Sequence, residues 1–104
     1  MTAQELYDEL TDDLRYDPLV SRSTMMGYPC VRYAGRFFAS YAAREDALVV
    51  KLPRERVAAL VETGAGDPFA PAGKVFREWL LLPEPDRDRW RELLAEALEF
   101  ARGQ

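Results

Sequence analysis

Two groups of charged side chains have types and spacings that could do chemistry. The adjacent Asp12 and Asp13 could bind a metal ion or share a proton, as paired carboxylates do at acid–base sites. Lys51, Arg54 and Arg56 lie near the start of an expected helix, where the helix dipole would help them to hold a phosphate or a carboxylate. We interpret both groups as solvated surface, because the aspartates lie off the apolar stripe of their helix and a glutamate stands among the basic residues.

A glycine- and proline-rich segment, 64–74, has the composition of a phosphate-binding loop but not its spacing. The Walker pattern needs glycine at position 68 and serine or threonine at position 75, where the chain has Pro68 and Val75. A dinucleotide-binding fingerprint that began at Gly64 would need a further glycine where the chain has Phe69. We predict instead that Phe69 is an apolar anchor that holds a long loop to the body of the domain.

Other catalytic chemistries lack their usual residues. The chain has no histidine, which excludes Ser-His-Asp and Cys-His catalysis and the histidine ligands of most catalytic zinc sites. Asp86 and Asp88 resemble the opening of a calcium loop, but Trp90 occupies the next ligand position. The single cysteine, Cys30, cannot form an internal disulfide. We therefore expect no catalytic residue, no metal site and no cofactor.

Length and composition predict one globular domain over 1–104. Hydrophobic residues make up 48% of the 104 residues, enough to close a core without disulfides or metals. The net charge of −4 argues against direct binding of nucleic acid, which needs a surplus of Lys and Arg. The sequence has neither the pattern of a signal peptide nor an apolar stretch of membrane-spanning length, so we expect a cytoplasmic protein with no membrane partner.

Three helices and a sheet are expected to form the domain. Thr2 and Glu5 match a capping box at the start of a helix over 2–16. Pro53 begins a second helix over 54–63, which Gly64 ends, and a third helix over 84–102 has an apolar stripe. Residues 77–82 read as a strand that is packed on both faces. The fold class is therefore α+β, an antiparallel sheet of about five strands backed by N-terminal, middle and C-terminal helices.

The segment 23–52 is predicted to form strands joined by tight turns. A two-residue turn at Ala34 and Gly35 would pair Tyr33 with Arg36, Arg32 with Phe37, Val31 with Phe38 and Cys30 with Ala39. The next turn would pair Tyr41 with Leu48 and Ala39 with Val50. Alternation then predicts a core face made of Cys30, Phe37, Ala39, Tyr41, Leu48, Val50 and Leu52. The opposite face would hold Val31, Tyr33, Phe38, Ser40, Val49 and Lys51, and a one-residue slip in either turn would exchange the two faces.

Several short motifs resemble the TfoX/Sxy N-terminal domain family. They are Met26-Gly27, the turn 35–39, the run 47–52 and the segment 77–83, although Met25-Met26-Gly27-Tyr28 stands where the family has Met-Phe-Gly-Gly. The resemblance implies an α+β fold similar to the YjbR-like and type III secretion chaperone-like folds. Some members of the family co-regulate transcription during natural competence in chains with a second, C-terminal domain, for which we expect no room here. The resemblance supplies no catalytic residues.

A non-enzymatic protein-interaction or regulatory module fits these observations best. Soluble monomers rarely leave a contiguous apolar patch uncovered, so the second sheet face is the expected interaction surface, with a protein partner or a second copy of the chain upon it. The candidate residues are Val31, Tyr33, Phe38, Val49 and Lys51. The alternatives are a small enzyme or ligand-binding protein that uses Asp, Glu, Arg or Tyr, and a homo-oligomer that only buries its own sheet.

Overall fold

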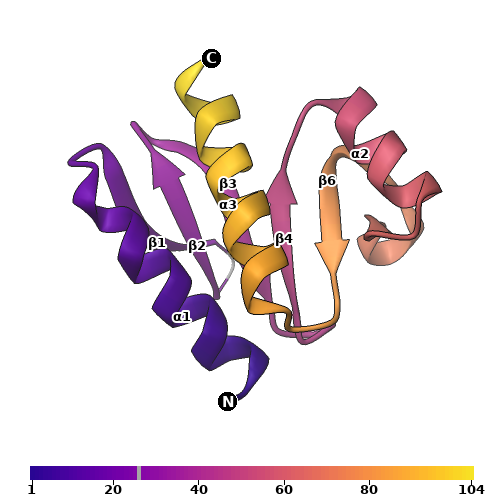
Figure 1. The fold of residues 1–104 in the computed structure, drawn as a ribbon, viewed down its shortest axis with the longest axis horizontal. Coiled ribbons are helices and arrows are strands. Elements are labelled where there is room, and N and C mark those ends of the chain that lie inside the picture. Colours follow the sequence, from indigo (N-terminus) through magenta and orange to yellow (C-terminus); the bar gives the residue numbers. More distant parts are fainter. Residues whose placement is uncertain (26) are drawn as a thin grey trace.

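Three helices and a six-stranded antiparallel sheet make up the computed structural model, which describes residues 1–25 and 27–104 (Figure 1). The predicted α+β class is confirmed, with six strands where about five were expected. Met26, which belongs to one of the motifs of the family resemblance, lies outside the described residues. The elements in chain order are α1 (Ala3–Asp13), the 3-10 turn η1 (Leu14–Tyr16), β1 (Val20–Met25), β2 (Tyr28–Tyr33), β3 (Arg36–Ala42), β4 (Ala47–Lys51), α2 (Arg54–Glu62), β5 (Asp67–Phe69), the 3-10 turn η2 (Pro71–Gly73), β6 (Phe76–Leu82) and α3 (Arg87–Arg102).

The sheet has the order β1-β2-β3-β4-β6-β5. The first four strands follow one another as a meander, and β6 then pairs with β4 after the excursion through α2. The short strand β5 forms the other edge of the sheet, in a segment that was predicted to be a loop. Phe69 lies at the end of β5, where it is half-buried, and its ring is 6.0 Å from that of Phe76 of β6.

Helices α1 and α3 each begin directly after a residue whose side chain caps the helix. Thr2 accepts a hydrogen bond from the Glu5 amide (3.1 Å), and the Glu5 carboxylate accepts one from the Thr2 amide (2.8 Å). Helix α3 begins at Arg87, later than expected, because Asp86 caps it by accepting a bond from the Arg89 amide (3.1 Å). The predicted apolar stripe of α3 is confirmed, since all its members are buried: Trp90, Leu93, Leu94, Ala97, Leu98 and Ala101.

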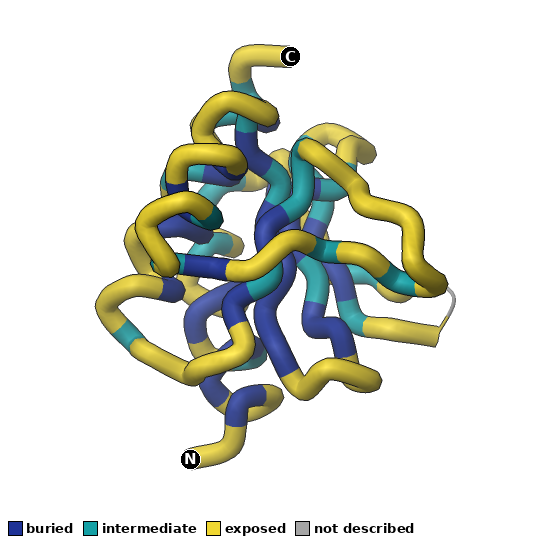
Figure 2. The backbone as a smooth tube through the Cα atoms, turned by 90° about the vertical axis from the view of Figure 1, so that its right-hand side faces the viewer, coloured by how far each residue is buried: buried dark blue, intermediate teal, exposed yellow. Residues whose placement is uncertain are grey.

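One core joins all three helices to one face of the sheet. It contains Leu6 and Leu10 of α1, Leu60 of α2 and the stripe of α3, packed against Leu48, Val50, Leu80 and Leu82 of the sheet and against Leu52, which directly follows β4. Figure 2 shows the buried backbone (dark blue) in the middle of the sheet and along the inner sides of the helices.

The turn at Ala34 and Gly35 has the predicted form, but β3 contains a bulge that was not predicted from the sequence. Both turn residues have positive φ, and Tyr33 pairs with Arg36 and Arg32 with Phe37, as expected. The register then shifts, so that Ala39 pairs with Val31 and Phe38 is the extra residue. Tyr41 pairs with Leu48 and Ala39 with Val50, so the second turn was predicted correctly.

The bulge reverses the predicted faces of β2 and of the start of β3. Ala39, Tyr41, Leu48, Val50 and Leu52 belong to the core, as predicted. Because one residue is inserted at Phe38, the alternation before it changes phase. Val31 and Phe38 therefore face the core, and their side chains are fully buried there. The predictions that Cys30 and Phe37 would be core residues of this face were wrong, since the pairings place both on the face away from the helices.

The candidate interaction residues consequently do not form one surface. Val31 and Phe38 are part of the main core, and Tyr33 packs against it. Val49 and Lys51 lie on the opposite face, as their pairing with Leu81 and Trp79 shows. The predicted surface is corrected in this respect, because only two of its five residues lie on the face that carries no helix.

Cys30 is buried, although on the other face from the one predicted. Its side chain is 1% exposed, and it pairs with Ser23 and Ser40 across the sheet. Burial raises the pKa of the Cys30 thiol, against the opposing effect of Arg32. Among the described residues, no helix has the length and the apolar character that a membrane crossing requires.

Candidate functional site

The helix-free face of the sheet, which no helix of the core covers, is the first candidate surface. We define it by the half-buried side chains Arg32, Phe37, Lys51, Trp79 and Leu81, which the strand pairings place on the same side as Cys30 and Val49. Val49 at its centre is 1% exposed, so the larger side chains around it exclude water. The surface is thus aromatic and aliphatic with basic groups along it.

Arg32 and Phe37 form a stacked pair on this face. The Arg32 guanidinium carbon lies 4.2 Å from the centre of the Phe37 ring, the geometry of a cation–π contact. The Arg32 Nε is buried and has no hydrogen-bond partner among the described residues. A buried donor without an acceptor costs free energy.

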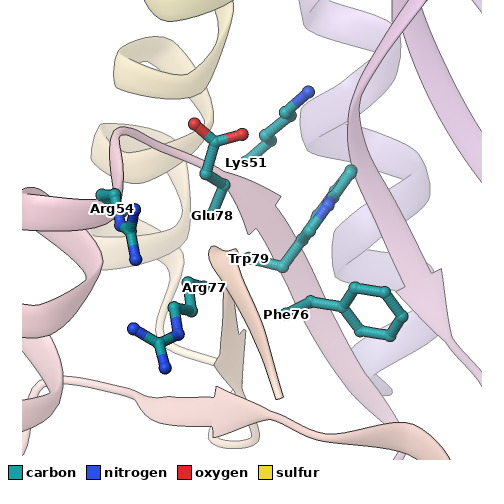
Figure 3. A pocket seen from close by; sticks show the side chains of 6 residues that line it. All are labelled: Lys51, Arg54, Phe76, Arg77, Glu78 and Trp79. Carbon is teal, nitrogen blue, oxygen red and sulfur yellow. The ribbon is translucent and has the colours of Figure 1, made fainter. Parts of the chain in front are cut away.

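The second candidate is a depression where β6 begins, next to the start of α2 (Figure 3). We call it the β6-end depression, and it has a volume of about 370 Å³. Its lining consists of Lys51, Arg54, Phe76, Arg77, Glu78 and Trp79. Figure 3 shows Lys51, Phe76 and Trp79 on one side of β6 and Arg54 and Arg77 on the other, with Glu78 between them. Lys51 and Trp79 also belong to the helix-free face, so the two candidates are continuous.

The basic group suggested by the sequence is only partly present. Lys51 and Arg54 both line the depression, but Arg56 is bound to Glu96 of α3, with its Nε 2.7 Å from the carboxylate. Arg77 takes its place, although it is distant in sequence. The sequence signal that could have identified Arg77 is its position two residues before Trp79 in a predicted strand. Trp79 pairs with Lys51, the last residue of the neighbouring strand.

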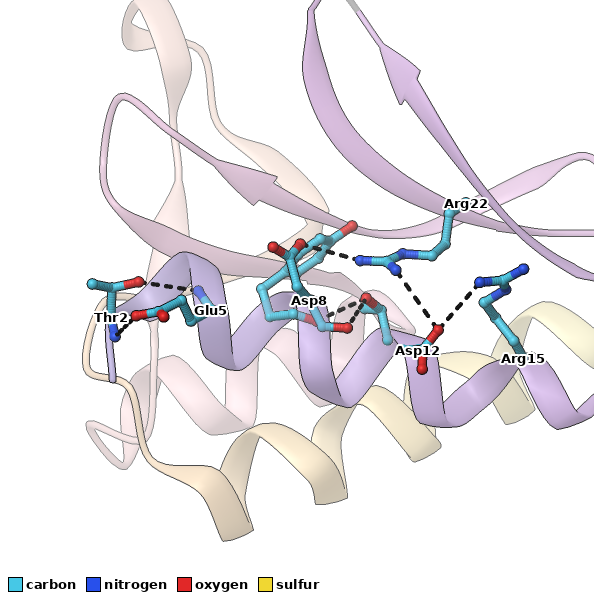
Figure 4. Close-up of polar contacts among 8 residues, drawn as sticks. Thr2, Glu5, Asp8, Asp12, Arg15 and Arg22 are labelled. Atoms are coloured by element: carbon cyan, nitrogen blue, oxygen red, sulfur yellow. Dashed lines mark hydrogen bonds and ion pairs between the residues drawn. The ribbon is translucent and has the colours of Figure 1, made fainter.

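The acidic side of α1 is already paired within the chain (Figure 4). Asp8 accepts a hydrogen bond from Arg22 of β1 at 3.1 Å, and Asp12 accepts one from Arg15 at 3.2 Å. The Arg22 guanidinium is also 3.8 Å from Asp12. The interpretation of the aspartates as solvated surface agrees with this arrangement, since Asp12 and Asp13 are exposed. Among the described residues there is no cluster of three or more His, Cys, Asp or Glu side chains that could hold a metal ion.

Gly66, in the glycine-rich segment, allows the backbone to pack closely against the core. Gly66 is buried, and a Cβ atom there would lie 2.7 Å from the Leu80 side chain in the core. The close approach of the backbone to Leu80 is therefore the reason for a glycine at this position.

Two tyrosines should make the stability of the fold fall at high pH. The hydrogen bond from Tyr41 to Asp46 and burial raise the pKa of Tyr41 to about 12. Burial also raises the pKa of Tyr7. In the unfolded chain both hydroxyls ionise near about pH 10. The contribution of the two protonated tyrosines to the free energy of unfolding is complete below that pH. It is lost as the pH rises toward the pKa values of the folded state, because the unfolded chain releases its protons first.

Urea unfolding over a series of pH values would check this expectation. The free energy of unfolding should be lower near pH ~11 than near pH ~9, and Tyr41→Phe should reduce that fall. An equal fall in the free energy of unfolding for the variant and the parent would contradict the expectation that Tyr41 keeps its proton in the folded state.

No protein-family model, curated protein or solved structure matches the chain. The resemblance to the TfoX/Sxy family therefore remains a prediction from sequence motifs.

Proposed function

We propose that the protein is a non-enzymatic interaction module that binds another protein through the helix-free face of its sheet. The observation that carries the proposal is the arrangement of the two layers. Helices pack on one face, whereas the other presents Phe37, Trp79 and Leu81 with no helix over them. Apolar side chains that remain partly exposed together on one face are typical of contacts with other proteins. The family resemblance adds control of transcription as a proposed setting.

An enzymatic function has less support. Among the described residues that line the β6-end depression, Glu78 is the one carboxylate, and the chain has no histidine. No pair of acids faces the depression, so the general acid and base of a two-carboxylate mechanism are not provided there.

Charge placed on the helix-free face should disrupt binding without unfolding the protein. Phe37→Asp replaces a half-buried ring beside Arg32, which can pair with the new carboxylate. Leu19→Asp is the matched control, because Leu19 is an exposed apolar residue that lies outside this face. Light scattering would report self-association. Affinity capture, followed by binding measurements with the purified captured protein, would report a different partner.

The proposal predicts that Phe37→Asp weakens a complex that Leu19→Asp leaves intact. It is contradicted if the protein is monomeric and every purified binder has the same affinity for both variants. A homodimer that Phe37→Asp dissociates would identify the partner as a second copy of the chain.

A further inference from the structure

The β6-end depression brings together several basic side chains that have no acidic partner within the described residues. Elsewhere many arginines are matched with acids: Arg22 with Asp8, Arg56 with Glu96, and Arg102 with Asp17 at 2.7 Å. In the described part of the chain, Lys51, Arg54 and Arg77 take part in no ion pair. Three positive charges therefore line the depression with one acid, Glu78, in a protein whose net charge is −4.

The same depression offers aromatic surface. Phe76 is 41% exposed, and Trp79 is half-buried, with its backbone paired to that of Lys51. A ligand lying across this end of β6 would therefore meet cations on both sides and an aromatic surface on one side. The volume of about 370 Å³ lies in the range of sites that hold a ligand with the size of several side chains rather than a single small anion.

We propose that the β6-end depression binds an acidic segment of a partner protein in which carboxylates alternate with apolar side chains. The carboxylates would pair with Arg54, Arg77 and Lys51, and an apolar side chain would lie on Trp79. This inference rests on the proposed interaction function and names the chemistry of the partner.

Two other occupants fit the observations less well. Nucleic acid would bring many phosphates to an acidic protein and would place them beside Glu78. A second copy of the chain could not offer the acids of α1 freely, because Asp8, Glu9 and Asp12 are already paired with arginines of the same chain.

The two tryptophans of the chain provide a direct test. Trp79 lines the depression, whereas Trp90 is fully buried in the core. In nitrogen–proton correlation spectra each indole gives its own signal. A short synthetic peptide of alternating Asp and Leu should move the Trp79 indole signal in a saturable way and leave that of Trp90 in place. The shift should weaken as salt is added, because added ions screen exposed charges.

Charge-reversal variants make the test specific. Arg54→Glu with Arg77→Glu should weaken peptide binding about tenfold or more, since two exposed ion pairs are lost and repulsion replaces them. Arg44→Glu with Arg89→Glu changes the net charge equally at exposed arginines outside the depression and should leave the affinity unchanged. Circular dichroism would confirm that both double variants are folded.

The other outcomes would overturn the inference. An oligothymidine of similar length that moved the Trp79 signal at lower concentration than the peptide would make the site a nucleic-acid site. Inorganic phosphate that bound as tightly as the peptide would make it a site for small anions. No shift with any probe, or equal losses in the two double variants, would show that the depression binds no acidic segment. If Phe37→Asp still abolished a protein complex in that case, the interaction function would stand and only the acidic partner would be rejected.

Discussion

Phe38→Asp is expected to abolish folding of the domain. Phe38 is the bulge residue of β3, and its side chain is fully buried in the main core. An ionised carboxylate in that position would lose its hydration without gaining a partner, which costs several kcal/mol, and the lost ring leaves a cavity that adds about 3–5 kcal/mol. A small domain has a stability of about 5–15 kcal/mol, so the variant should be largely unfolded by circular dichroism.

Phe37→Asp is the matched control for this experiment. Phe37 is the preceding residue and carries the same ring, but it lies on the helix-free face, where its side chain is only half-buried. The variant Phe37→Asp should remain folded, with a urea midpoint close to that of the parent. If Phe38→Asp is folded and Phe37→Asp is not, the bulge is misplaced and the two faces are exchanged.

Trp90→Ala should be the most destabilising change in the helices. Trp90 is 0% exposed and is among the largest fully buried side chains, and truncation of such a residue costs about 3–5 kcal/mol. Trp90→Phe should cost much less. The Trp90 Nε1 has no hydrogen-bond partner among the described residues, so its removal leaves no broken bond.

Urea unfolding of the two variants would compare them directly. Trp90→Ala should lower the free energy of unfolding by several times as much as Trp90→Phe. Similar losses for the two variants would contradict the expectation that a phenyl ring keeps most of the packing of Trp90. A loss of well under 1 kcal/mol for Trp90→Ala would show that α3 does not pack on the sheet through this residue.

The parts of the fold that depend on local signals were predictable from the sequence. The capping box of Thr2 and Glu5, the stripe of α3 and the turn at Ala34 and Gly35 each follow from residues close together in the chain. The short strand β5 was not predictable from such signals. Its three residues include Pro68, and it is held as a strand by pairing with β6.

The faces of β2 and β3 could not be read from hydrophobicity. Cys30 and Val31 are both fully or almost fully buried, so alternation along β2 gives no signal of which one faces the helices. Phe37 and Phe38 are adjacent and identical, and the bulge that separates their environments is decided by packing across the sheet. A prediction that assumes regular alternation therefore fails at this point.

The candidate site was predictable only in part for a similar reason. Lys51 and Arg54 are close in sequence, so their proximity followed from the expected helix start. Arg77 and Trp79 reach the same place only through the pairing of β6 with β4. Arg56 was removed from the group by Glu96, which is 40 residues away and approaches only when α3 packs beside α2.

The order of the strands has a consequence for the folding pathway. Strands β1 to β4 are joined by short turns, so each of their pairings closes a small loop at low entropic cost. The pairing of β6 with β4 must close the much longer loop through α2, β5 and η2, and α3 can dock only on strands that are already aligned. We therefore expect the amides of β2, β3 and β4 to become protected in pulse-labelled hydrogen exchange before those of β6. Earlier protection of β6 would place the folding nucleus in the second half of the chain.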